Sequence, residues 1–157
     1  MDKSNLTTHI KRLGNSIGFQ SIAITSPDIT QAYERFQTLL SKGYHADMEY
    51  LERHSDLRAT PSHLFPNTRS ILLTRLDYLP PNSGIAKQLK QKEYAYIARY
   101  AVGRDYHKKI RKMLRRLAKQ IEQITGPFHY RPFADSAPIL EKPLAEKAGL
   151  GWQGKNT

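Results

Sequence analysis

The chain has 157 residues, contains no cysteine and carries a formal net charge of +11, from 25 Lys and Arg against 14 Asp and Glu. This length fits one domain with its own core, and no stretch approaches the roughly 20 apolar residues of a membrane span. The absence of cysteine rules out a disulfide framework, and the N-terminus lacks the basic start and apolar centre of a secretory signal. We therefore expect a cytoplasmic protein with no membrane partner.

The positive charge bears on the kind of partner. A surplus of this size favours polyanions such as RNA, DNA or anionic lipid, although a basic protein that binds none of them carries the same charge.

Hydrophobic periodicity predicts alternating helices and strands in the first part of the chain. Residues 6–16 indicate a short opening helix, and residues 19–25 alternate with the period of two of a half-buried strand. Asp28 or Thr30 can cap the next helix, which ends at Gly43.

A continuous apolar run marks the middle of the chain. After a short helix around Met48 and Leu51, residues 70–76 form an apolar run of strand length, centred on Ile71-Leu72-Leu73 and bounded by turn residues, which predicts a central strand. Residues 78–93 are expected to form a loop.

The longest periodic element is a helix predicted over residues 104–124, which ends at Gly126-Pro127. Residues 128–133 then predict a strand that leads to Asp135, and Pro138 is expected to start a helix that finishes near Gly149. The fold class is therefore α/β or α+β, a single compact domain with a small mixed sheet flanked by helices, one of them long, basic and amphipathic.

Basic residues gather on one side of the helix predicted over residues 104–124. They lie opposite its apolar stripe and are Lys108, Lys109, Arg111, Lys112, Arg115, Arg116 and Lys119. Such a ridge can neutralise nucleic-acid phosphates and release counterions. A solvated amphipathic face is the alternative, but such faces usually mix charge signs and this one has almost no Glu. The candidate nucleic-acid contacts are Lys108, Lys112, Arg115 and Lys119.

Two familiar site patterns can be rejected. Residues 149–154 spell G-x-G-x-x-G, but they follow a predicted helix instead of a strand, and Asn156 stands where a P-loop needs Ser or Thr. A helix-ending turn remains, as does close approach of the glycine backbone to a phosphate or a flat cofactor. The six histidines have no metal-ligand spacing, so we expect no metal site.

Two short segments carry the candidate catalytic chemistry. Asp135 is expected at the carboxyl end of a strand, where α/β folds meet ligands, although Asp-Ser before a Pro-initiated helix is also an ordinary cap. Asp105 stands at a predicted helix N-terminus, where it either caps the helix or joins a ligand site. Glu141 and Lys142 follow Asp135 and can shape the electrostatics of its pocket.

Four stretches together carry a resemblance to a known family. They are L-D-Y-L-P-P at 76–81, A-R-Y-A-V-G-R-D-Y-H at 98–107, D-S-A-P-I-L-E-K at 135–142 and G-L-G-W-Q-G-K-N-T at 149–157. With them the chain, from about residue 18 to residue 157, resembles the N-terminal half of the epoxyqueuosine reductases, cobalamin- and iron–sulfur-dependent enzymes of queuosine-tRNA synthesis. The resemblance implies that residues 1–157 form a cobalamin-binding, catalytic domain of an oxidoreductase that reduces epoxyqueuosine to queuosine at the wobble position of tRNA.

The resemblance also implies roles for individual residues. Asp135 would be the proton donor, and since Asp has an ordinary pKa of about 3.9, it would need desolvation in a closed pocket to hold a proton near neutrality. The residues implied in the cofactor pocket are Arg58, Arg104, Asp105, Tyr106, His107, Ser136, Lys155, Asn156 and Thr157.

One departure from the family limits these expectations. Iron–sulfur clusters are held by cysteine thiolates, and this chain has none. The electrons would then come from an absent cysteine-rich half or from a separate iron–sulfur polypeptide or reductant, and the chain by itself is expected to be inactive. The alternatives are a non-catalytic module that binds RNA through its basic helix, and an inactive truncated fragment.

Overall fold

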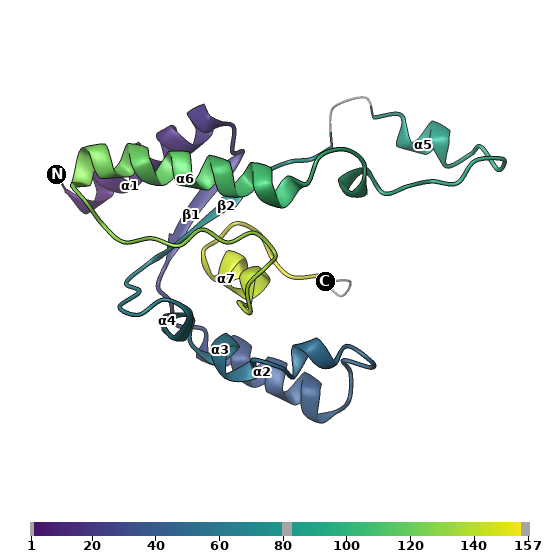
Figure 1. Ribbon diagram of the computed structural model, residues 1–157, viewed down its shortest axis with the longest axis horizontal. Helices are drawn as coiled ribbons and strands as arrows, with labels where there is room; N and C mark the ends of the chain where they lie inside the picture. Colours follow the sequence, from purple (N-terminus) through teal and green to yellow (C-terminus); the bar gives the residue numbers. More distant parts are fainter. Residues whose placement is uncertain (1, 80–82, 155–157) are drawn as a thin grey trace.

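The computed structural model describes residues 2–79 and 83–154, and these form an α+β domain built on a small sheet (Figure 1). The helices are α1 (Lys3–Ile17), α2 (Thr30–Ser41), α3 (Ser55–Ala59), α4 (Pro61–Leu64), α5 (Ile85–Gln88), α6 (Tyr106–Thr125) and α7 (Glu141–Lys147), with short 3-10 turns η1 (Glu49–Leu51) and η2 (Arg99–Ala101). The strands are β1 (Ser21–Thr25) and β2 (Ile71–Arg75). The predicted class, a small sheet flanked by helices, is confirmed. Within the described ranges, no helix has the length and apolar character needed to cross a membrane.

The core lies where α1 and α6 pack against the sheet (Figure 1). Both helices carry apolar residues at three- and four-residue spacing, so each buries one stripe. The centre of the core consists of Ile10, Phe19, Ile22, Leu117 and Ile121. Gly14 allows α1 to approach β1 closely, because a Cβ there would lie 1.6 Å from Ile22 Cδ1. The stripe predicted on the long helix therefore faces the core.

The two strands pair antiparallel, with Ala23 opposite Leu73 in the middle of the register. Residues 70–76 were predicted as a central strand, but among the described strands β2 pairs with β1 alone and the sheet has two strands. The connection between them runs through α2, α3 and α4, which form a lobe beside the sheet, the α2–α4 lobe (Figure 1).

The strand predicted over residues 128–133 is wrong, because this segment has no regular secondary structure. Pro132 removes a backbone N–H donor from the run and Pro127 directly precedes it, so the segment cannot form a continuous ladder with a neighbouring strand. Asp135 therefore lies on an irregular loop, and not at the end of a strand.

The last helix is shorter than predicted. Two tight turns occupy the start of the segment, in which Ile139 N–H donates to the Ala137 carbonyl and Glu141 N–H donates to the Ile139 carbonyl. Helix α7 consequently begins at Glu141, three residues after Pro138. Leu144 anchors it with a side chain that is fully buried.

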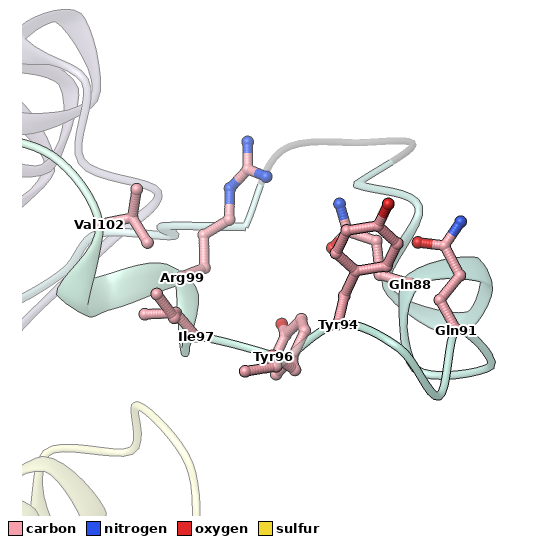
Figure 2. A pocket seen from close by; sticks show the side chains of 8 residues that line it. Gln88, Gln91, Tyr94, Tyr96, Ile97, Arg99 and Val102 are labelled. Atoms are coloured by element: carbon pink, nitrogen blue, oxygen red, sulfur yellow. The ribbon is translucent and has the colours of Figure 1, made fainter.

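An extended arm, residues 83–103, projects away from the sheet (Figure 1). Part of it was predicted as loop, but it contains the short helix α5 as well as η2. Its large apolar side chains are exposed, namely Leu89, Tyr94, Tyr96, Ile97, Tyr100 and Val102. Figure 2 shows several of them along an open groove of about 580 Å³ that is lined by arm residues. The arm thus has little core of its own.

Candidate active site

Asp105 caps the N-terminus of α6. Its Oδ1 accepts a hydrogen bond from the backbone N–H of His107 at 2.9 Å and lies 2.9 Å from Nδ1 of the same residue. The hydrogen bond from the His107 ring is the main cause that lowers the pKa of Asp105. The sequence left open whether this residue is a cap or part of a ligand site, and the structure shows the cap.

Tyr106 and Asp135 meet across 29 residues of sequence. The Tyr106 hydroxyl donates a hydrogen bond of 2.7 Å to Asp135 Oδ2, which joins the start of α6 to the irregular loop. This hydrogen bond raises the pKa of Tyr106 to about 12, so the phenol remains a donor at physiological pH. The Tyr106 ring also stacks on His107, with ring centroids 4.1 Å apart.

The backbone of Asp135 is unusual. Its φ of 52° lies in the left-handed region, which residues other than glycine seldom adopt. The neighbouring Ala134 is buried, while Asp135 and Ser136 are exposed. The buried Ala134 therefore anchors the loop in the protein, while the Asp135 carboxylate remains accessible to solvent.

Glu141 is a second acidic group beside Asp135. It is half-buried at the start of α7, and this burial is the main cause that raises its pKa to about 7. The negative charge of Asp135 raises the pKa further, whereas His107 lowers it. Near neutral pH a fraction of the molecules consequently hold a protonated Glu141 beside Asp135. Glu141 was expected to shape the electrostatics of this pocket, but nothing in the sequence indicated that burial would raise its pKa.

Most of the predicted site residues on α6 and the loop lie together. Asp105, Tyr106, His107 and Asp135 are joined by the contacts above, and Arg104 and Ser136 flank them with exposed side chains. Lys155, Asn156 and Thr157 lie outside the described residues.

The contacts of Arg58 lie in the α2–α4 lobe, and not with the group formed by Tyr106 and Asp135. It lies on α3, where its guanidinium donates hydrogen bonds to the carbonyls of Arg53 at 2.6 Å and Leu51 at 3.3 Å. It also lies over the Phe36 ring, 5.8 Å from the centroid. These contacts hold the α2–α4 lobe together, and the place of Arg58 in the cofactor pocket stays a prediction.

The glycine-rich segment ends α7. Gly149 has a φ of 77° and donates its N–H to the Glu146 carbonyl, while Leu150 N–H donates to the Ala145 carbonyl, which is a Schellman turn. Beyond it, Trp152 is 82% exposed. A flat ligand can therefore approach this backbone, and the exposure of the Trp152 indole could not be read from the sequence.

The basic face of α6, defined as Lys108, Lys112, Arg115 and Lys119, is exposed along the helix. Leu117 and Ile121 on the other side are buried. The predicted separation of charge from core is confirmed. Among the residues that the structure describes, no three His, Cys, Asp or Glu side chains are grouped so that they could hold a metal ion.

Comparisons with known proteins give a consistent match. A family model described as "Epoxyqueuosine reductase QueG, DUF1730" matches residues 58–136. Epoxyqueuosine reductases from Salmonella typhimurium and Escherichia coli are 46% and 45% identical to this chain over all 157 of its residues. The chain spans 41% of the length of each.

Solved structures share the fold. A selenomethionine-labelled epoxyqueuosine reductase matches with a TM-score of 0.77 at 24% identity. One solved with an epoxyqueuosine-modified tRNA-Tyr stem loop has a TM-score of 0.75 at 23% identity. The Bacillus subtilis enzyme, solved with its catalytic aspartate loop swung out of the active site, has a TM-score of 0.72 at 22% identity. Each likeness covers 99% of this chain and 41% of the other.

Proposed function

The chain belongs to the epoxyqueuosine reductase QueG family, and on this premise we propose that it is the N-terminal part of an enzyme that reduces epoxyqueuosine to queuosine at the wobble position of tRNA. The observation that carries the proposal is the contact between Tyr106 and Asp135, beside the half-buried Glu141. It gathers proton-carrying groups on an exposed loop and at the start of α7. By itself the chain is expected to be inactive.

Asp135 is the proposed general acid. Converting an epoxide to an alkene and water consumes two electrons and two protons, and a carboxylic acid on an exposed loop can deliver a proton to the departing oxygen. The Bacillus subtilis relative has a catalytic loop that is named by an aspartate, and we propose that the Asp135 loop is its counterpart here. Glu141, with a pKa of about 7, supplies a second carboxyl group that still binds a proton near neutrality.

Cobalamin is the proposed cofactor, and the residues present fit one side of it. His107, Asp135 and Ser136 offer polar groups, and the exposed Trp152 beside the open Gly149 turn offers a flat surface without bulky neighbours. When bound, cobalamin would supply the electrons for the reduction. The task of this chain is then to hold the cofactor edge and to present the Asp135 proton.

Iron–sulfur clusters do not fit this chain, because it has no cysteine to bind them. We assign them to a further part of the protein or to a separate polypeptide. The tRNA is proposed to contact the basic face of α6 through its phosphates. A cytoplasmic location belongs to the same proposal, since tRNA is modified there in bacteria.

A non-catalytic RNA-binding module is the second candidate, and the exposed basic face favours it. The two candidates differ in cofactor binding, which the single tryptophan can report. Titration with cob(II)alamin should quench Trp152 fluorescence and shift the visible spectrum of the cofactor if the first proposal holds. No change at high micromolar concentration would remove the cofactor claim for this chain.

The catalytic proposal is tested in a full-length protein completed with the part that the relatives possess. Asp135→Asn keeps the size of the side chain but removes the acidic proton, so turnover should fall by ~10²-fold or more while folding stays normal. Asp47→Asn, on an exposed residue in the α2–α4 lobe, is the matched control. Reduction of epoxyqueuosine by Asp135→Asn at the parental rate would exclude Asp135 as the acid.

A further inference from the structure

We propose that Tyr106 is a positioning residue for Asp135, and that its phenol hydrogen bond holds the 134–140 loop with the carboxylate in the site. This inference rests on the proposed role of Asp135 as general acid. It assigns to Tyr106 the orientation of the acid, whereas the resemblance implied a place for it in the cofactor pocket.

The donor is rigid. Tyr106 is the first residue of a 20-residue helix whose other end is fixed in the core by Leu117 and Ile121. Its ring stacks on His107, and Asp105 binds both the backbone and the ring of His107. Since the phenol keeps its proton up to a pH of about 12, it remains a hydrogen-bond donor under all physiological conditions.

The acceptor lies on a segment with few constraints of its own. No residue from 127 to 140 belongs to a helix or strand. The buried Ala134 precedes Asp135, and the next fully buried anchor is Leu144. The left-handed backbone of Asp135 is unfavourable for a residue with a side chain, so it persists only where contacts hold it. The hydrogen bond of 2.7 Å from Tyr106 is such a contact.

The charges around the pair agree with this assignment. The Tyr106 phenol donates to the Asp135 carboxylate, and the negative charge of Asp135 is one of the causes that raise the pKa of the half-buried Glu141, so these three groups lie together. The Tyr106 hydrogen bond therefore orients Asp135 beside a second carboxyl group, Glu141, whose raised pKa allows it to hold a proton near neutrality. Because the Asp135 carboxyl group is already oriented, the loop does not have to bring it into position during each turnover.

The test uses Tyr106→Phe, which removes the phenol oxygen and keeps the ring that stacks on His107. In the 157-residue chain, hydrogen exchange of residues 134–140 should become about fivefold faster, the equivalent of one lost net hydrogen bond. Residues 110–121 of α6 should exchange as before. Asp135→Ala, which removes the acceptor, should accelerate the same loop, and Tyr94→Phe on the exposed arm is the matched control.

The completed full-length enzyme provides the second measurement. Tyr106→Phe should lower kcat about fivefold with the KM for tRNA unchanged, and it should have no further effect when combined with Asp135→Asn. Unchanged loop exchange in Tyr106→Phe would overturn the positioning role, whatever the rates. Faster loop exchange together with a fully active Asp135→Asn would instead overturn the proposed acid, and with it the catalytic purpose of this contact.

Discussion

Replacement of Glu141 by Gln should make the protein more stable at alkaline pH. The carboxyl group is half-buried beside Asp135, and burial first, then the Asp135 charge, raise its pKa from an ordinary value of 4.5 to about 7. Glutamine has nearly the same shape but never ionises. The substitution therefore removes the cost of a buried negative charge with little change in packing.

The size and sign of the effect follow from the pKa. The folded protein binds the Glu141 proton more tightly than the unfolded chain does, so the stability linked to this group is fully present below pH 4.5 and is lost as the pH rises through about 7. Each pKa unit corresponds to about 1.4 kcal/mol, so the full penalty at pH 8 to 9 amounts to about 3 kcal/mol. Glu141→Gln should gain up to that amount at pH 8.5 and almost nothing at pH 4.

Urea unfolding followed by far-UV circular dichroism at pH 4, 5.5, 7 and 8.5 measures this difference. The gap between the unfolding free energies of Glu141→Gln and the parent should widen with pH, mainly between pH 5 and 8. Glu34→Gln, on an exposed residue of α2, is the control and should give an offset that does not vary with pH. A constant offset for Glu141→Gln as well would refute the argument that burial keeps this carboxyl protonated.

Other substitutions test the core and the charged surface. Leu144→Ala should cost about 2–5 kcal/mol in unfolding free energy, because the side chain is fully buried and leaves a cavity. Gly14→Ala should cost about 1–2 kcal/mol, since overpacking of the core outweighs the gain in helix propensity; a more stable variant would contradict the close approach of α1 to the sheet. Joint replacement of Lys112, Arg115 and Lys119 by Glu should weaken binding of all tRNAs alike and flatten its salt dependence in filter binding, and an unchanged salt slope would exclude the basic face as the tRNA contact.

Secondary structure could be predicted from the sequence where it depends on neighbouring residues, and it could not where it depends on contacts with distant segments. The helix α6 was predicted to within two residues, because an apolar stripe and the Gly126-Pro127 stop are local signals. The segment 128–133 was wrongly predicted as a strand, because alternation in sequence does not reveal whether a partner strand is available.

In the candidate site, too, the sequence indicated the residues but not the contacts between them. The D-S-A-P and R-D-Y-H segments indicated which residues to consider, but the hydrogen bond between Tyr106 and Asp135 depends on tertiary packing across 29 residues. The same holds for Glu141, whose raised pKa results mainly from burial. Arg58 was assigned to the site through the resemblance, and its hydrogen bonds to nearby carbonyls could not be read from its position in the chain.

The arm at residues 83–103 has a consequence for how unfolding responds to denaturant. The m-value and the heat capacity change both scale with the surface that becomes exposed on unfolding. Large arm side chains such as Tyr94 and Ile97 are 74% and 66% exposed in the folded protein, so melting the arm uncovers little more. Urea titration of the chain should accordingly give an m-value below that of a globular domain of 157 residues, and this m-value reports the sheet with α1 and α6.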